Sequence, residues 1–378
     1  MADRKDKLVR VNIADLVSQY RGIQAEVEEA VVRVLRSGSY VLGDNVRALE
    51  AEMARYCGVR YALGVNSGTD ALLLALMALE VGPGDEVIVP AFTIIVDAAV
   101  VCLLRAKPVF VDIDPSTFNI DVNQLEQRIT ERTKAIVAVH LYGQMAEMDK
   151  IVTMARAHDI AVVEDACQAI GAEHRSRRAG SVGQIGCFSF YPTKNLGAYG
   201  DGGLITTDDE GLWQKIRLLR AHGDVGQYDH VTIGLNSRLD EIQAAILRAK
   251  LTKVDTWNNA RRRNAQRYTA SLEAVDGIEV PLQTADSHHV FHQYTIRAKN
   301  RDSLQQYLKE HDITTAIYYP IPLHLQKALN HLTYKPGDLP ASERASREVL
   351  SLPVYAELEA DKIEYVVDLV RSFFSANA

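Results

Sequence analysis

The sequence predicts an α/β protein, with a large domain built on a mainly parallel sheet and a smaller α+β C-terminal domain. From residue 61 to about 245, short apolar runs rich in β-branched residues alternate with longer helical patterns. The runs are apolar on both faces, which is typical of parallel strands covered by helices on each side. After residue 255 this alternation stops, and a chain of 378 residues is long for a single core.

The elements of the large domain follow from these runs. The expected strands are "YALGV" (61–65), "DEVIVP" (85–90), "KPVFVDI" (107–113), "AIVAVHLY" (135–142), "IAVVED" (160–165) and "CFSFY" (187–191). Helical spacing marks 69–81, 148–159 and 241–254, whereas "DGGLITTDDE" (201–210) has the glycines and aspartates of a turn or hairpin. We expect this domain to span 15–250, after an N-terminal arm of residues 1–14.

The second domain is expected over 251–378. Its pattern predicts a helix over about 257–274, then a strand (290–298), a helix (303–311), a strand (313–319) and a closing amphipathic helix (361–375).

The composition argues against several classes of protein. Hydrophobic residues make up 47% and charged residues 24%, as in ordinary globular proteins. With 42 Lys+Arg against 49 Asp+Glu the formal net charge is −7, so we expect no nucleic-acid partner. The four cysteines lack metal-like spacing, and we find neither an export signal nor a membrane-spanning apolar run. We therefore expect a cytoplasmic protein with no membrane contact and no structural metal.

Polar residues follow the ends of three expected strands, where ligands of open α/β sheets bind. Ser67, Gly68 and Thr69 follow the first of these strands, at the start of a helix. Free backbone N–H groups and the helix dipole suit an anion such as phosphate there. A plain N-cap explains the same three residues equally well.

A carboxylate and a lysine follow two later strands. Asp165 comes directly after a hydrophobic strand, with Gln168 three residues further on. A buried carboxylate needs a partner, which is either a protonated pyridine nitrogen or a structural arginine or backbone group. Ser189 leads into Lys194, which lies in a glycine-rich turn where a sheltered lysine can form a Schiff base. Taken alone, a lysine in such a loop is usually just solvated.

The three features together are more specific than any one of them. A phosphate cradle, a buried acid and a lysine, each at a strand end, match the phosphate, the pyridinium and the aldehyde of pyridoxal 5′-phosphate (PLP). The sequence therefore predicts a PLP site with Lys194 and Asp165 as its catalytic residues.

Eight fragments, found in the same order, resemble the sugar aminotransferases of the DegT/DnrJ/EryC1/StrS family, and the similarity covers nearly the whole chain from about residue 10. They are "NSGTDAL", "GPGDEVIVPAFT", "KPVFVDID", "HLYGQ", "VVEDACQAIGA", "SFYPTKNLGAYGDGG", "GLNSRLDEIQAAIL" and "YYPIPLHLQ". The resemblance implies a PLP enzyme of fold type I, like aspartate aminotransferase. It also implies that Lys194 binds the cofactor covalently, that Asp165 pairs with the pyridine nitrogen, and that Gln168 lies near the ring.

The same resemblance implies how the phosphate is held. Ser189 and the backbone around Gly68 and Thr69 match the phosphate site, and Asn236 matches a residue that reaches it from the neighbouring subunit. The implied assembly is a homodimer with shared active sites.

The family's activity is transamination of a nucleotide-linked keto sugar, usually with L-glutamate as amino donor. "NSRLD" is similar to members that act at sugar position three, so a 3-keto UDP- or dTDP-hexose is expected. Arg238, Tyr319 and His324 are the implied substrate residues, although a packing or surface role explains each as well. A 4-keto sugar, a non-sugar ketone and a non-catalytic regulatory paralogue stay open. Related dehydratases carry histidine in place of Lys194, some with an iron–sulfur cluster.

The chain departs from the family at two positions. Ile94 stands where many members have an aromatic residue stacked on the cofactor ring, which leaves either an aliphatic surface or Phe92 for that role. Tyr318 replaces a frequent histidine. The histidines of "HHVFHQY" (288–294) do not share one face of a strand and have no carboxylate nearby, so we expect no metal there.

Overall fold

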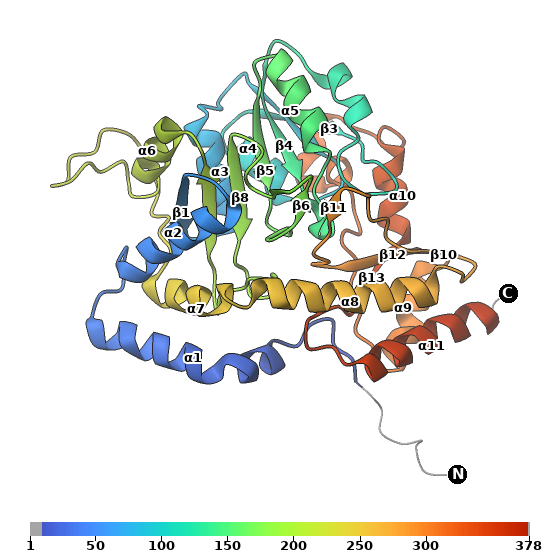
Figure 1. The fold of residues 1–378 in the computed structure, drawn as a ribbon. Helices are drawn as coiled ribbons and strands as arrows, with labels where there is room; N and C mark the ends of the chain where they lie inside the picture. The colour runs from blue at the N-terminus through green and yellow to red at the C-terminus, as the bar shows by residue number, and fades with distance from the viewer. Residues whose placement is uncertain (1–9, 377–378) are drawn as a thin grey trace.

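The computed structural model describes residues 10–376, and its central element is a seven-stranded sheet (Figure 1). Across the sheet the strands are β1 (Tyr61–Val65), β9 (Gly203–Thr207), β8 (Ile185–Ser189), β5 (Ala161–Asp165), β4 (Thr133–Val139), β2 (Glu86–Pro90) and β3 (Lys107–Val111). Parallel pairing connects β3, β2, β4, β5 and β8, whereas β9 runs antiparallel to β1 and β8. The predicted α/β class with a mainly parallel sheet is confirmed.

Strand β9 occupies the stretch that the sequence marked as a turn or hairpin. Its five residues are all buried, because β1 and β8 pair with it from both sides. The turn alternative is wrong for these five residues, whereas their antiparallel pairing with the preceding strand β8 agrees with the hairpin alternative. Local glycine and aspartate signals carry no information on pairing with the distant strand β1.

Helices cover both faces of the sheet, and alternate residues of each strand point into two separate apolar cores. On β5, for example, Val162 belongs to one core and Val163 to the other. The core that contains Val163 is covered by α3 (Gly68–Ala78), α4 (Val96–Leu103) and α6 (Glu210–Leu219). The core that contains Val162 is covered by α2 (Asp44–Cys57), α5 (Met148–Ala157) and α7 (Glu241–Leu251), and α1 (Leu16–Ser37) packs on α7.

A third apolar core lies in the C-terminal part of the chain. It is built from a three-stranded antiparallel sheet and the helices that pack on it. These elements are α8 (Val254–Leu272), β10 (Ile278–Glu279), β12 (Tyr294–Ala298), α9 (Arg301–Glu310), α10 (Pro340–Glu348), β13 (Val349–Leu352) and α11 (Ala360–Ala376). The boundary that we expect near residue 250 remains a prediction. Residues 1–9 of the expected arm lie outside the described residues.

The strand expected over 313–319 does not form. Ile313 makes an isolated bridge with Val11, and Ala316 makes another with Ser351. Because these two partners come from different parts of the chain, no continuous ladder develops.

Smaller elements complete the fold. A second three-stranded sheet consists of β11 (Ser287–His288), β6 (Glu173–His174) and β7 (Arg177–Arg178). Short 3₁₀ helices cover Val122–Gln124, Glu126–Arg128, Leu141–Gly143, Leu323–Leu325 and Lys327–Leu332. Within residues 10–376, no helix has the length and apolar character needed to cross a membrane.

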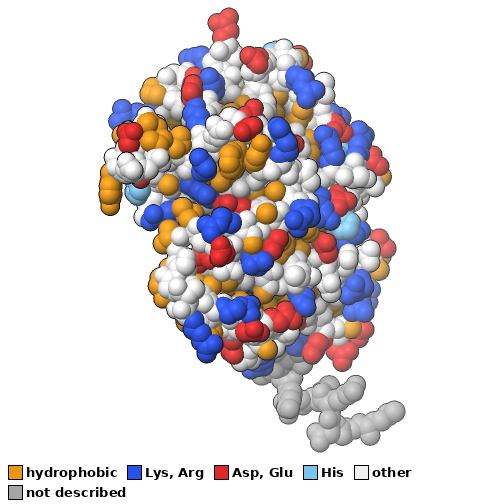
Figure 2. All heavy atoms as spheres, turned by 60° about the vertical axis from the view of Figure 1, so that its left-hand side comes forward, with side chains coloured by type: hydrophobic (Ala, Val, Ile, Leu, Met, Phe, Trp, Pro, Cys, Tyr) orange, Lys and Arg blue, Asp and Glu red, His pale blue; other side chains and the backbone are white. Residues whose placement is uncertain are grey.

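A long loop after α6 projects from the body (Figure 1). Four large apolar side chains on this loop are exposed: Val225, Tyr228, Val231 and Ile233. Figure 2 brings this side of the molecule forward and shows apolar side chains at its projecting edge.

Candidate active site

A cavity of about 510 Å³ lies where β5 and β8 end and α3 begins. Its wall contains most of the residues that the sequence singled out for PLP, together with Tyr319. They are Gly68, Thr69, Asp165, Gln168, Ser189, Lys194 and Tyr319. Segments more than 100 residues apart in the chain therefore meet at the edge of the sheet where α/β ligands bind.

The start of α3 forms one wall of the cavity. Ser67 caps the helix, since its Oγ accepts the Asp70 N–H at 3.1 Å. The N–H groups of Gly68 and Thr69 have no acceptor within residues 10–376. A Cβ at residue 68 would lie 2.7 Å from the Ser189 Cβ, so only glycine fits there. The N-cap and an anion-binding N-terminus are thus compatible, because the cap uses other N–H groups than the two left free.

Asp165 is the last residue of β5 and is buried, with 4% of its surface exposed. Its Oδ1 accepts the Cys167 N–H at 3.0 Å, and no lysine or arginine of the described chain forms an ion pair with it. Gln168 is fixed beside it. Gln168 Oε1 accepts the Tyr142 N–H at 2.8 Å, and its Nε2 donates to the Tyr319 hydroxyl at 3.2 Å. Of the structural alternatives for Asp165, an arginine partner has no counterpart in residues 10–376, whereas the backbone partner is present as the Cys167 N–H.

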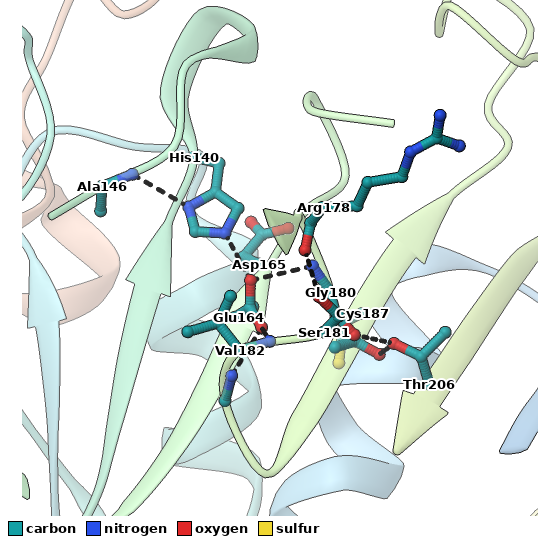
Figure 3. A network of polar contacts seen from close by, with 12 residues as sticks. His140, Ala146, Glu164, Asp165, Arg178, Gly180, Ser181, Val182, Cys187 and Thr206 are labelled. Carbon is teal, nitrogen blue, oxygen red and sulfur yellow. Dashed lines mark hydrogen bonds and ion pairs between the residues drawn. The ribbon is translucent and has the colours of Figure 1, made fainter. Parts of the chain in front are cut away.

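Glu164 points to the opposite face of β5 and anchors it (Figure 3). Its Oε2 lies 2.8 Å from His140 Nε2 and accepts the Gly180 N–H, also at 2.8 Å. Its Oε1 accepts the N–H groups of Val182 at 2.6 Å and Gly183 at 2.7 Å. Burial raises the pKa of this carboxyl, but His140 and the N–H donors outweigh burial and hold the pKa below its usual value. This network fixes the end of the strand that carries Asp165.

Lys194 follows β8 in a tightly packed loop. Its backbone N–H donates to the Tyr191 carbonyl at 2.8 Å. A Cβ at Gly197 would lie 2.3 Å from the Pro192 carbonyl oxygen, so the turn excludes any larger residue. The buried Lys250 donates to the Gly197 carbonyl and closes the loop from behind.

The Lys194 amine is the only lysine or arginine group in the cavity wall of the described chain. Burial lowers the pKa of this amine, and the neighbouring Cys167, Asp165 and Asp97 offset part of the effect. A lowered pKa increases the fraction of the amine that is neutral and nucleophilic, which is the form that makes a Schiff base.

Ile94 lines the cavity and is 40% exposed. Phe92, the alternative, is buried behind the wall and packs against Tyr319, with ring centroids 6.2 Å apart. The structure thus brings the aliphatic side chain to the cavity, together with Tyr318 and Tyr319.

Three of the predicted site residues do not line this cavity. Asn236 is exposed at the base of the projecting loop, and Arg238 is half-buried next to it. His324 is buried elsewhere, with its Nε2 3.1 Å from Glu343 Oε1. In a single chain, therefore, Tyr319 is the only one of the three substrate candidates that the cavity contains.

The family model for the DegT/DnrJ/EryC1/StrS aminotransferases matches residues 21–371. The chain belongs to this family. The family resemblance inferred from the sequence is confirmed, and so is the expectation of an enzyme of the aminotransferase class.

Two curated relatives of this chain have names that point to different functions. A Geobacillus stearothermophilus protein, 48% identical over 97% of this chain and 99% of its own length, is named a pleiotropic regulatory protein. An Acidithiobacillus ferrooxidans protein, 45% identical over 96% and 97% of the two chains, is named a UDP-N-acetyl-3-dehydro-α-D-glucosamine 3-aminotransferase.

Solved structures of family members superpose closely. Streptomyces venezuelae DesV, crystallised with a ketimine intermediate, is 44% identical, with a TM-score of 0.94 over 96% of this chain and 98% of its own. The ntda protein from Bacillus subtilis, solved with bound cofactor PMP, is 30% identical, with a TM-score of 0.91 over 99% and 87% of the two chains.

The cavity also contains residues that the sequence analysis missed as site residues, among them Cys167, His292 and Gln293. His292 was considered only as a metal ligand. In the structure its Nδ1 lies 3.1 Å from Asn195 Oδ1, and burial lowers its pKa well below the usual value, with Lys194 adding to the effect. Within residues 10–376 no three His, Cys, Asp or Glu side chains gather as a metal site would require.

A further missed residue is Asp97, on α4. It is fully buried and close enough to Lys194 and Asp165 to affect their environment. One sequence signal could have revealed it, since Asp97 is the single charge in the apolar run "TIIVDAAVV" (93–101).

Proposed function

We propose that this protein is a PLP-dependent aminotransferase that converts a nucleotide-linked 3-keto sugar, on a UDP- or dTDP-hexose, into an amino sugar with L-glutamate as amino donor. The observation that carries the proposal is one cavity that joins Lys194, Asp165 and the free N–H groups at the start of α3. The family and the relative named a UDP-sugar 3-aminotransferase support the reaction class.

The cavity residues fit the cofactor at each of its polar groups. The Gly68 and Thr69 N–H groups, at the N-terminus of α3, and the Ser189 hydroxyl, at the end of β8, suit the phosphate. The buried Asp165 carboxylate suits a protonated ring nitrogen. The ring would then lie beside Gln168 and against Ile94.

PLP supplies an electrophilic aldehyde and a ring that accepts an electron pair. The protein's own contribution is to place protons. The Asp165 carboxylate would hold a proton at the ring nitrogen, and the Lys194 Nζ, whose pKa burial lowers, would accept and return a proton of the substrate. Tyr318 and Tyr319 line the same cavity and would limit the access of water to these atoms.

We infer a homodimer as the active form. A nucleotide diphosphate and the carboxylates of glutamate need cations, yet Lys194 is the only lysine or arginine in the cavity wall of the described chain. The projecting loop ends at Asn236 and exposes Tyr228 and Ile233, at 90% and 87%. A loop of this kind suits insertion into a second copy, where Asn236 would approach the phosphate and Arg238 the substrate.

The direct test of the reaction is incubation of the purified protein with L-glutamate and a panel of 3-keto and 4-keto sugars on UDP and dTDP. We expect mass spectrometry to detect an amino sugar from a 3-keto substrate. The Lys194→Ala variant is the control for uncatalysed exchange. Failure of the wild type to bind PLP after reconstitution would refute the proposal outright, and product from only the 4-keto sugars would overturn the position.

The name of the Geobacillus stearothermophilus relative favours a second candidate, a regulatory protein that binds PLP or a nucleotide sugar without turning it over. The panel also separates these two functions. Bound PLP that L-glutamate does not convert to its aminated form, with no product from any sugar, would support the regulatory candidate.

A further inference from the structure

Asp97 is a buried acid that the proposed reaction does not use. It lies in the first turn of α4 with none of its surface exposed. Its Oδ2 accepts the Thr93 hydroxyl at 2.8 Å, whereas its Oδ1 is buried without a partner within residues 10–376. An ionised carboxylate with a buried, unpaired oxygen is costly, so the proton state of Asp97 needs an explanation.

Asp97 lies next to Asp165, which lines the cavity. The two side chains lie within hydrogen-bonding reach of each other, although neither carboxylate can donate unless one of them is protonated. Burial, and then the charge of Asp165, raise the pKa of Asp97 well above its usual value, against the lowering effects of Thr93 and Lys194. The other titratable groups that face Asp97 are Tyr319 and Cys187.

The contacts decide which of the two acids holds the proton. Asp165 already accepts a backbone N–H from Cys167 at its Oδ1, so this oxygen acts as a hydrogen-bond acceptor. Asp97 accepts only a neutral hydroxyl, and its free Oδ1 is the remaining position for a proton.

We propose that Asp97 is a protonated carboxylic acid that donates a hydrogen bond from Oδ1 to the Asp165 carboxylate and acts as a positioning residue for it. The pair then carries one negative charge, and Asp165 is held in orientation from the side of α4. The role toward the cofactor rests on the proposed function, in which Asp165 pairs with the ring nitrogen, but the proton on Asp97 does not depend on it.

Two variants separate a neutral acid from an ionised one. Asp97→Asn is uncharged and keeps an oxygen for Thr93 and an N–H for Asp165. Asp97→Leu has similar volume but can make neither bond. If Asp97 is protonated, the PLP dissociation constant of Asp97→Asn should stay within about threefold of wild type. That of Asp97→Leu should rise about tenfold or more, because the leucine cannot make the hydrogen bond to the charged Asp165.

A second readout is independent of PLP. Infrared difference spectra of the cofactor-free protein in H₂O and D₂O at neutral pH should show the carbonyl band of a buried protonated carboxyl in the wild type and not in Asp97→Asn. Asp112→Asn is the matched control and should retain the band. Asp112 is also buried, but it accepts hydrogen bonds from Ile113, Ala341 and Ser342, which suit an ionised carboxylate.

The proposal is overturned if the wild type lacks this band, if Asp97→Asn keeps it, or if Asp97→Asn weakens PLP binding as much as Asp97→Leu does. The last result would mean that the cofactor needs a negative charge on Asp97. If Asp97→Leu does not fold, the Asn variant and the infrared spectra still decide. A wild type that shows the band but binds no PLP would refute the proposed function and leave the proton on Asp97 intact.

Discussion

Replacement of Glu164 by glutamine should destabilise the fold by about 3 to 6 kcal/mol, the range for two lost hydrogen bonds to a buried charged group. The change is nearly isosteric, so no cavity forms. It removes the charge and one acceptor oxygen from a side chain that is fully buried. The loss of stability should therefore come from weaker hydrogen bonding to residue 164 and not from a change in packing.

The contacts of Glu164 allow the magnitude to be worked out. The Ala146 N–H donates to His140 Nδ1 at 3.2 Å, so the imidazole proton lies on Nε2 and donates to Glu164. With an amide nitrogen in place of Oε2, that N–H and the Gly180 N–H would each face another donor. Two lost bonds to a charged group, at about 1.5 to 3 kcal/mol each, sum to about 3 to 6 kcal/mol.

The assay is urea unfolding of the cofactor-free wild type and variant, followed by circular dichroism at several pH values. Because the folded-state pKa of Glu164 is lowered, its contribution is complete above its unfolded value of about 4.5 and is lost as the pH falls through the folded-state pKa. The difference between the two proteins should therefore be constant near neutral pH and shrink in acid.

The matched control is Glu147→Gln. Glu147 pairs with Lys150 at the surface, with 51% of its side chain exposed, and its loss should cost less than about 1 kcal/mol. A Glu164→Gln variant as stable as this control, or a difference that grows in acid, would contradict the account of the network.

Three further predictions concern the site and the loop. Lys194→Ala should lower transamination at least about a hundredfold, since proton transfer by a positioned group contributes that much, with an unchanged circular dichroism spectrum. Gly68→Ala should raise the PLP dissociation constant about tenfold, because the new Cβ would lie 2.7 Å from the Ser189 Cβ; equilibrium dialysis measures it. The double variant Tyr228→Ser and Ile233→Ser should shift the protein from dimer to monomer in light scattering, as both side chains are exposed in the single chain.

The glycine and loop predictions each have a control in the same chain. Gly82→Ala should leave PLP binding unchanged, since a Cβ there would have no atom within 4 Å. Leu103→Ser removes another exposed apolar side chain, 69% exposed, and should leave the dimer intact. Full activity in Lys194→Ala, equal PLP binding in both glycine variants, or a dimer that survives the double change would each contradict the corresponding argument.

The sequence by itself determined much of this protein because the relevant signals are local. Apolar β-branched runs predict buried parallel strands. Ser67, Asp165 and Lys194 can be recognised as candidate site residues because they follow the ends of such runs. The order of these residues along the chain predicted a PLP site, and the resemblance of eight fragments indicated the family.

Tertiary structure decided what depends on distant partners. It made a strand of Gly203–Thr207, because β1 and β8 pair with it from both sides. It brought Ile94 rather than Phe92 to the cavity, and it set Asp97 against Asp165 from a separate helix. The physical reason is that pairing and burial are set by residues far away in the sequence, whereas periodicity and turn signals describe only a residue's neighbours along the chain.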